Sequence, residues 1–179
     1  TQADLTANGH AIECRIYAED PDAGFLPSPG KITSLRRPSG PGVRDDSGVE
    51  AGFEVPVFYD SMISKVIAWA PERAGAIERM RRALSEYEIG GVTTVIPALL
   101  WVLGRKEFAE GRFDTAFLDR VLADRAGKSF SALNAEELDL AIIAAALFRY
   151  FSDGDLNCEG SDDTTTPWRR AARLEGVRH

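Results

Sequence analysis

The sequence predicts an α+β protein, in which an antiparallel sheet is packed by helices and is followed by a helical connector. Two observations predict this class. Short segments in which apolar and polar residues alternate, separated by Pro and Gly, occupy roughly residues 10 to 70. Segments with apolar residues at helical spacing follow from about residue 72 onward. Because the strands precede the helices instead of alternating with them, an α+β class is expected rather than a parallel α/β sheet.

The strand segments differ in how their apolar residues are arranged. Ile12, Cys14 and Ile16 alternate with polar residues, which is typical of a strand with one buried face. Residues 31–56 continue as short strands joined by hairpins. Residues 61–70 are expected to form a longer strand, whose two mainly apolar faces favour a sheet covered on both sides.

The segment AEDPDAGFLPSPGKI, residues 18–32, contains three prolines and two glycines. Proline fixes φ and removes a hydrogen-bond donor, so a stiff loop is expected, with Phe25 and Leu26 anchored inward. Such rigidity positions neighbouring groups, although these residues do no acid–base chemistry themselves.

Three helices are expected after the strands, and their apolar stripes are attributed to core packing. They are expected over residues 71–88, 93–104 and 114–127. Gly90-Gly91 is expected to end the first helix. Thr94 or its neighbour is expected to cap the second helix, which tolerates Pro97 in its first turn, and Asp114 is expected to cap the third.

Composition argues against several classes of function. The 179 residues carry a formal net charge of −7, whereas a general nucleic-acid surface needs a surplus of Lys and Arg. Cys14 and Cys158 lie far apart in unlike contexts, the chain has two histidines, and no metal-ligand spacing is present. Both cysteines are therefore expected to be reduced thiols of a cytoplasmic protein. No signal peptide is recognised, and no apolar run reaches the ~18 residues of a membrane span, so no membrane interaction is expected.

The motif PSGPGVRDDS is the first candidate for chemistry. Its two glycines allow a tight turn, and in the strand that follows Arg44 points away from the face that Val43 occupies. A guanidinium held there presents a planar fork, which suits two-point binding of a carboxylate, a phosphate or an enolate-like oxygen. The alternative is that Arg44 forms a surface ion pair with Asp45, Asp46 or another carboxylate, and such pairs are common.

The motif FYDSM places Tyr59, Asp60 and Ser61 at the start of the longer strand. Asp60 is suited to cap a turn by accepting hydrogen bonds from nearby backbone N–H groups. No base or nucleophile follows it at a telling spacing, so a structural role is preferred to a catalytic one.

Several motifs, taken together, closely resemble the C-terminal domain of biotin carboxylase. They are GHAIECRIYAEDPDAGFLPSPGKI, PGVRDDSGVEAGFEVPVFYDSMISKVIAWAPERAGAIERMRRALSEYEIGGVTT and GRFDTAFLD. The similarity runs from about Gly9 to Arg120, in the right order and without large gaps. Several unrelated motifs at the correct spacing make the resemblance specific.

In this family the enzyme uses ATP and bicarbonate to carboxylate a ureido nitrogen of biotin, which is carried on a lysine of a carrier domain. The resemblance implies that Arg44 matches the family's active-site arginine, which helps to stabilise the biotin enolate and to bind the anionic reactants. A fixed guanidinium is most effective where such negative charge develops. With the family considered, the catalytic interpretation of Arg44 is preferred. The resemblance also implies that Thr115 borders the adenine pocket of the ATP site.

The resemblance further implies a domain organisation and a set of partners. Residues 1–120 are expected to form the biotin carboxylase C-terminal domain, and residues 121–179 a helical connector. An ATP-grasp domain that binds ATP and Mg²⁺ is expected upstream, and a biotin carrier domain beyond the connector. Other expected partners are a second copy in a homodimer and a carboxyltransferase subunit, which selects acetyl-, propionyl- or methylcrotonyl-CoA. The fragment is expected to be inactive alone.

The connector contains one helical pattern and one acidic segment. An alanine-rich helix is expected over residues 134–151, with Asn134 at the N-cap and Glu137 three residues later. A flexible acidic linker is expected at about residues 152–166.

Two other functions stay open. In this family the same domain contributes to the dimer contact, so a non-catalytic assembly or dimerisation module is the first alternative. Part of another ATP-grasp ligase, such as a carbamoyl-phosphate-synthase-like protein, is the second. The chain also departs from the family pattern at Val95, where Asn is frequent, and near Gly90, where an acidic or larger residue is frequent. Both positions are expected at a helix entry.

Limited proteolysis is expected to cut first between Ser152 and Thr166. The reason is that an acidic segment with few apolar residues cannot bury enough surface to become ordered. Mass spectrometry of the earliest fragments locates the cut, and resistance of this segment would show that the linker interpretation is wrong.

Overall fold

The computed structural model describes residues 1–56, 58–125, 127–130 and 135–154. By its contacts the chain divides into two units, residues 1–132 and 133–179, which are described separately. The domain boundary expected after residue 120 stays a prediction. Among the described residues, no helix combines the length and the apolar character needed to cross a membrane.

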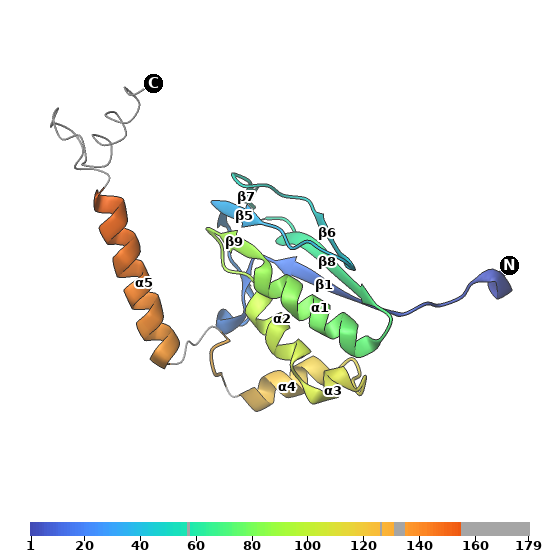
Figure 1. Ribbon diagram of the computed structural model, residues 1–179. Helices are drawn as coiled ribbons and strands as arrows, with labels where there is room; N and C mark the ends of the chain where they lie inside the picture. The colour runs from blue at the N-terminus through green and yellow to red at the C-terminus, as the bar shows by residue number, and fades with distance from the viewer. Residues whose placement is uncertain (57, 126, 131–134, 155–179) are drawn as a thin grey trace, which may run out of the picture. The chain divides into compact units, whose positions relative to one another are not determined.

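In the first unit most strands precede the helices (Figure 1). The strands are β1 (His10–Tyr17), β2 (Glu19–Asp20), β3 (Leu26–Pro27), β4 (Gly30–Lys31), β5 (Ser34–Arg36), β6 (Val43–Ser47), β7 (Glu54–Val55), β8 (Met62–Ala70) and β9 (Glu88–Gly90). The α-helices are α1 (Arg73–Glu86), α2 (Ile96–Leu103), α3 (Lys106–Ala109) and α4 (Phe117–Arg125), and the 3₁₀ helices are η1 (Gln2–Asp4) and η2 (Pro21–Ala23).

A three-stranded antiparallel sheet of order β1–β8–β6 forms the centre of this unit. In it Cys14 of β1 lies opposite Val66 of β8, and Arg44 of β6 lies opposite Ile67 of β8. The other strands form three antiparallel pairs, β2 with β3, β4 with β7, and β5 with β9. Antiparallel pairing with helices packed on the sheet confirms the predicted α+β class.

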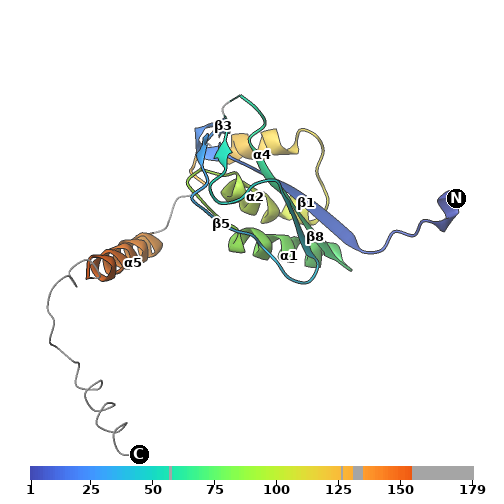
Figure 2. The same ribbon diagram turned by 90° about the horizontal axis from the view of Figure 1, so that it is seen from above.

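The core lies between α1 and one face of the three-stranded sheet (Figures 1 and 2). At helical spacing, α1 buries Ala76, Ile77, Met80, Ala83 and Leu84. At the strand period of two, β1 buries Ile12, Cys14 and Ile16, as predicted, and β8 buries Ser64, Val66, Ala68 and Ala70. Burial, with a smaller contribution from the charge of Glu13, raises the pKa of the Cys14 thiol to about 12.

The helices cover one face of this sheet, and the expectation of a sheet covered on both sides holds only in part. On the outer face Ile63, near the start of β8, is buried, whereas Arg44 and Asp46 of β6 are exposed. On the outer face Ile67 lies between Glu13 of β1 and Arg44 of β6 and is half-buried. Trp69 keeps 39% of its surface exposed, and its indole nitrogen donates to the Asn8 carbonyl at 3.0 Å. The outer apolar side chains of β8 are therefore sheltered by adjacent segments of the chain instead of by a second layer.

The proline-rich loop is ordered by one carboxylate. Asp20 accepts hydrogen bonds from the backbone N–H groups of Asp22 and Ala23, at 2.9 and 3.3 Å, and so caps η2. Phe25 follows with φ of 62°, a rare conformation for a residue other than glycine, and is half-buried. Leu26 is 63% exposed, so the expectation that both residues point inward is wrong for Leu26. The turn at Phe25 directs the next side chain outward.

The end of α1 differs from the sequence prediction. The helix ends at Glu86, and residues 88–90 form β9 instead of continuing toward the two glycines. Gly90 pairs with Ser34 of β5. A Cβ on Gly90 would lie 2.9 Å from Thr33 Oγ1 and closer still to Ser34 Oγ. The close approach of two strands, and not a helix entry, therefore favours glycine at position 90.

The caps of the later helices follow the prediction in part. α2 begins at Ile96 with Val95 at the N-cap and no side-chain cap, so Thr94 does not cap it. Pro97 lies in the first turn, as expected. Val95 is buried, and its N–H donates to the Tyr17 carbonyl at 3.2 Å, so this position attaches the start of α2 to the end of β1. Asp114 accepts from the Ala116 N–H at 3.1 Å, ahead of α4.

In the second unit the structure describes α5 (Ala135–Gly154), which confirms the predicted helix. The cap residue Asn134 lies outside the described residues. The expected linker begins inside this helix, because α5 continues through residue 154, and residues 155–166 lie outside the described residues. Several large apolar side chains of α5 are exposed, among them Leu140, Phe148 and Tyr150.

Met80→Ala tests the packing of α1 on the sheet. Met80 is fully buried, so the truncation should lower the free energy of unfolding by about 2–5 kcal/mol through lost burial and a residual cavity. Urea unfolding followed by circular dichroism measures the change. The matched control, Glu78→Ala on the exposed side of α1, should stay within about 0.5 kcal/mol of the wild type. Equal effects of the two variants would contradict this assignment of the core.

Candidate functional site

Arg44 lies on the outer face of the three-stranded sheet. The strand β6 alternates between half-buried and exposed residues, so Arg44 and Asp46 project outward while Val43 and Asp45 project inward. The Arg44 side chain is 71% exposed, and its Nη2 donates to Asp46 Oδ2 at 3.0 Å. This hydrogen bond engages one of the five N–H donors of the guanidinium. The structure thus shows the ion pair considered as an alternative for Arg44, and it also leaves the guanidinium accessible.

Further charged side chains share this outer face. Lys65 of β8 lies opposite both Asp46 of β6 and Arg15 of β1. Arg15 is paired in turn with Glu13, with 3.3 Å between Nε and Oε1. The outer face of the sheet therefore carries Arg44, Lys65 and Arg15 among two carboxylates. The exposed pairs of Arg44 and Arg15 contribute little stability, so these two guanidinium groups can exchange a carboxylate partner for an anionic ligand at little cost.

The inner face of β6 carries a buried carboxylate that the sequence analysis did not single out. The Asp45 side chain is 5% exposed, and Arg37 Nε lies 3.8 Å from its Oδ2. Burial raises the pKa of Asp45, whereas the Ser64 hydroxyl and Arg37 oppose this effect. The Ser64 and Tyr87 hydroxyls approach the carboxylate, although within the described residues no donor reaches it with good hydrogen-bond geometry. The alternation in VRDDS, which puts Asp45 on the side of Val43, was the signal that could have found it.

The buried hydroxyls around Asp45 are themselves connected. Tyr87, directly after α1, donates from its hydroxyl to Ser64 Oγ of β8 at 3.1 Å. Arg37 Nη2 donates to the Val49 carbonyl at 2.5 Å, so this guanidinium is shared between Asp45 and the β6–β7 connection. The Tyr87–Ser64 hydrogen bond joins the end of α1 to β8, and the ion pair with Arg37 holds Asp45 on the inner face of β6.

Thr115 lies in a separate part of the unit. It is exposed in the turn before α4, between Asp114 and Ala116. Arg120 Nη2 lies 2.9 Å from Asp114 Oδ1, and this interaction lowers the pKa of Asp114. Thr115 precedes α4, whereas Arg44 belongs to β6, and α1 and α2 lie between these two elements in Figure 1.

The motif FYDSM, which contains Asp60 and Ser61, has the expected structural role. Asp60 Oδ1 accepts from the Met62 N–H at 3.1 Å and caps the entry to β8. Ser61 is buried, and its hydroxyl donates to Glu19 Oε1 at 2.9 Å.

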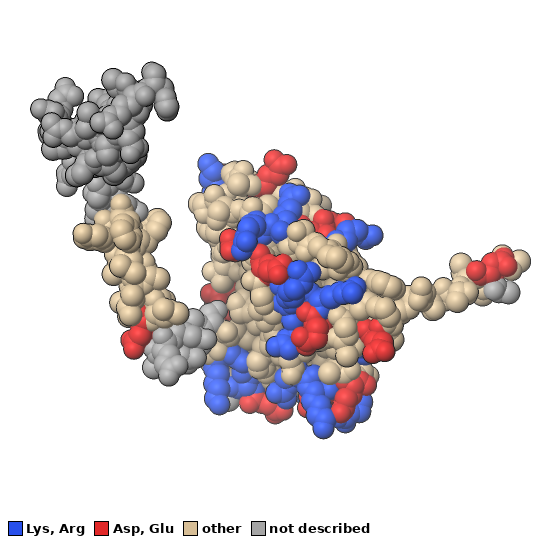
Figure 3. Space-filling model, in the orientation of Figure 1, with Lys and Arg blue, Asp and Glu red and all other residues tan. Residues whose placement is uncertain are grey.

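Charges of both signs are mixed over the helical face. Figure 3 shows Lys and Arg interspersed with Asp and Glu over α1 and over the helices below it. Across the described ranges, no group of three or more His, Cys, Asp and Glu side chains is arranged to hold a metal ion. The chemistry available at the outer face is therefore that of guanidinium and ammonium donors.

The sequence profile of the biotin carboxylase C-terminal domain matches residues 13–120, which include β1, β6, β8 and α1. The chain belongs to the biotin carboxylase C-terminal domain family. A pyruvate carboxylase subunit of Methanothermobacter thermautotrophicus is 56% identical over 119 residues, covering 66% of this chain and 24% of the relative. The propionyl-CoA carboxylase alpha chain of Ruegeria pomeroyi is 40% identical over 166 residues, covering 82% of this chain and 24% of the relative.

A solved structure shares the fold of this biotin carboxylase C-terminal domain. It is the biotin carboxylase domain dimer of the Hydrogenobacter thermophilus 2-oxoglutarate carboxylase, in complex with MgADP, ADP and bicarbonate. The TM-score is 0.67 at 42% identity, and the match covers 74% of this chain and 28% of the solved one. The chain thus spans about a quarter of the length of these relatives.

The Asp45 carboxylate gives a pH-dependent contribution to stability with a definite sign. Its pKa in the folded protein is raised above the ordinary 3.8. Its contribution is therefore fully present below that value and is lost as the pH rises through the raised pKa. Relative to the wild type, the free energy of unfolding of Asp45→Asn should rise as the pH is raised above the ordinary carboxyl pKa of 3.8, because the amide does not ionise.

Urea unfolding at a series of pH values measures this difference. Asp46→Asn, which alters an exposed neighbour, should follow the wild-type pH dependence more closely. A difference between Asp45→Asn and the wild type that does not change with pH would contradict the raised pKa.

Proposed function

We propose that the chain forms the C-terminal part of a biotin carboxylase, which carries out ATP- and bicarbonate-dependent carboxylation of carrier-bound biotin. The observation that carries the proposal is an accessible guanidinium, Arg44, fixed on a strand within the segment matched by the family profile. We further propose that this chain is a ligase component that completes the active site of an ATP-grasp domain and is inactive alone.

The donors of the outer face fit the chemical groups of this reaction. Bicarbonate and the phosphates of ATP are anions, which guanidinium and ammonium groups bind, and a ureido oxygen accepts hydrogen bonds. Carrier-bound biotin supplies the nitrogen that receives the carboxyl group. The role of Arg44 is to donate N–H bonds to the oxygen on which negative charge develops, where a preorganised donor has its largest effect.

Asp46 gives Arg44 a defined orientation before reactants arrive. The Arg44–Asp46 pair is exposed on both sides, with 71% and 48% of the side chains accessible. An exposed pair of this kind stabilises the fold by at most about 1 kcal/mol, so Arg44 can leave Asp46 for a reactant oxygen. The Asp46 carboxylate would then occupy, in the absence of reactants, the donor of Arg44 that the anionic ligand uses.

The acyl-CoA carboxylases are the class that the similarity favours. The match to the propionyl-CoA carboxylase alpha chain covers 82% of this chain, whereas the match to the pyruvate carboxylase relative covers 66%. The longer match reaches into the segment beyond residue 132. We therefore propose the alpha chain of an acyl-CoA carboxylase, whose partners are a carrier domain and a carboxyltransferase subunit.

The remaining partners and the location follow from the same proposal. The solved biotin carboxylase domain is a dimer, which supports a homodimer for the intact protein. Thr115, exposed in the turn fixed by Asp114, is proposed to border the adenine site. The buried free thiol of Cys14 is compatible with the reducing conditions of the cytoplasm, where we place the enzyme.

Arg44→Ala in the full-length protein tests the proposal. The substitution should lower biotin carboxylation by ~10²–10³, the usual loss for one preorganised donor to developing charge. Arg44→Lys should recover part of the rate, since it keeps the charge but not the planar fork. The assay is ATP- and bicarbonate-dependent carboxylation of free biotin.

Two controls make this test specific. ATP binding and thermal unfolding of Arg44→Ala should stay close to the wild type, because the side chain is exposed. Arg36→Ala, which removes an exposed and equally ion-paired arginine from β5, should keep the wild-type rate. A wild-type rate for Arg44→Ala would show that Arg44 is a surface ion-pair residue, and the assembly module would then be the preferred function.

A further inference from the structure

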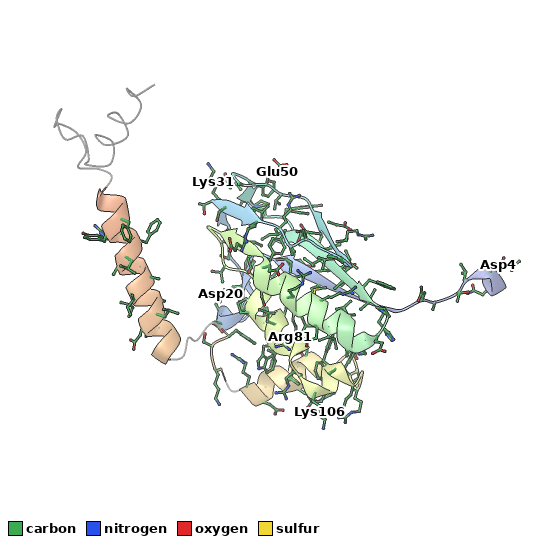
Figure 4. The ribbon with its side chains drawn as sticks, viewed as in Figure 1. Asp4, Asp20, Lys31, Glu50, Arg81 and Lys106 are labelled. Atoms are coloured by element: carbon green, nitrogen blue, oxygen red, sulfur yellow. The ribbon has the colours of Figure 1, made fainter. Side chains whose placement is uncertain are left out.

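Residues 128–130 follow α4 and lie against the proline-rich loop, and they are referred to as the anchor segment. Asp22 of η2 accepts two hydrogen bonds from them, one from the Ser129 hydroxyl at 2.5 Å and one from the Phe130 N–H at 2.7 Å. Asp20, labelled in Figure 4, marks the start of η2. Hydrogen bonds to a carboxylate are roughly twice as strong as those between neutral groups. One side chain of the loop between β2 and β3 therefore binds a segment more distant than any helix of the first unit.

Arg125, at the end of α4, binds the backbone and the aromatic side chain of the anchor segment. Its Nε donates to the Lys128 carbonyl at 2.6 Å, and its Nη2 donates to the Ser129 carbonyl. Its guanidinium carbon lies 3.8 Å from the centre of the Phe130 ring and 5.1 Å from the centre of the Trp101 ring. At such distances the ring faces attract a cation. A single guanidinium thus satisfies two carbonyls of the anchor segment and contacts its ring.

The Phe130 ring packs against α2. Its centre lies 5.6 Å from that of Trp101, and the two rings meet edge to face at 80°. Phe130 is half-buried, although it follows two exposed residues. The family profile ends at residue 120, ahead of Arg125 and of the anchor segment. The contacts of Phe130 therefore attach a part of the chain beyond the family match to η2, α2 and α4.

We propose that Asp22, Trp101 and Arg125 form a binding surface for the chain's own anchor segment, which fixes the point where the connector leaves the first unit. The inference rests on the proposed biotin carboxylase function, in which a carrier domain follows the connector. With the anchor segment bound, residues 131–134 precede α5, whereas its release would place residues 126–134 between α4 and α5. This connection would about double in length, and doubling a flexible tether lowers the effective concentration of the tethered group by about threefold. The bound anchor segment thus favours delivery of carrier-bound biotin to the active site.

Hydrogen exchange of Asp22→Ala in the full-length protein tests the binding surface. Exchange of the Phe130 amide, followed by mass spectrometry, should become roughly 10-fold faster, because a hydrogen bond to a charged acceptor is lost. Asp22→Asn should give an intermediate rate, since its side chain keeps one acceptor oxygen. The matched control is Asp124→Ala, which removes an exposed carboxylate from α4 and should leave this exchange unchanged. Unchanged exchange in Asp22→Ala overturns the binding surface.

A comparison of free with carrier-bound biotin tests the role of the anchor segment. Asp22→Ala and Phe130→Ala should carboxylate free biotin at the wild-type rate, because free biotin needs no tether. Transfer of radiolabelled bicarbonate to the protein's own biotin, measured in a single turnover, should become about threefold slower in both variants. Phe130→Tyr keeps the ring and should retain the wild-type rate. Asp22 is exposed, so Asp22→Ala carries the comparison if thermal unfolding shows that Phe130→Ala does not fold.

The outcomes separate this inference from the proposed function. Wild-type labelling of carrier-bound biotin, in a variant whose Phe130 amide exchanges faster, overturns the role of the anchor segment. An equal loss with free and with carrier-bound biotin also overturns it, since that loss would lie in the active site and not in delivery. Both results leave the proposed function standing. A wild-type protein that carboxylates no biotin overturns the proposed function and the role in delivery, whereas the exchange measurement decides the binding surface independently.

Discussion

The packing of α1 against β8 is the interaction on which the rest of the first unit depends. The buried stripe of α1 that includes Met80 and Leu84 covers the inner face of the sheet. Tyr87, immediately after the helix, adds a hydrogen bond to Ser64 of β8. The exposed side of the same helix sends Arg79 to the backbone of β8. One helix therefore covers the inner face of the sheet and also contacts the backbone of β8 where the turn before Arg44 is attached. The position of Arg44 thus depends on the burial of apolar surface under α1.

The strand β6 has to satisfy opposite requirements on its two faces. Arg44 needs access to solvent or to a ligand, whereas Asp45, the next residue, is held inside beside Arg37 and two hydroxyls. A slip of one residue in the pairing of β6 with β8 would exchange these environments, exposing the buried acid and burying an arginine. The hydrogen bond between the Trp69 N–H and the Gly42 carbonyl extends the pairing past the start of the strand and so fixes its register.

Much of this arrangement could be predicted from local sequence, because strand period and turn chemistry are local properties. Local sequence predicted the alternation around Cys14, the glycine turn before Arg44 and the cap at Asp60. The strand β9 was not, since residues 88–90 acquire strand geometry by pairing with β5, some fifty residues earlier. The exposure of Leu26 depends on the positive φ of Phe25, which sequence preference opposes. Arg79 of α1 contacts the Trp69 carbonyl of β8 and lies beside Gly42. No spacing within the sequence predicts these contacts.

The burial of Cys14 gives the sheet an internal reporter. A thiol whose pKa is about 12 is almost entirely protonated at neutral pH, and the protonated form is a poor nucleophile. Alkylating reagents can therefore modify it at an appreciable rate only after β1 separates from β8 or α1 lifts away. Because Cys14 lies in the middle of β1, opposite Val66, its labelling rate counts openings of the central sheet. The rate at which Cys14 is alkylated therefore reports local unfolding of the sheet. Cys14 lies in β1, which pairs with the same central strand, β8, as the strand β6 that carries Arg44.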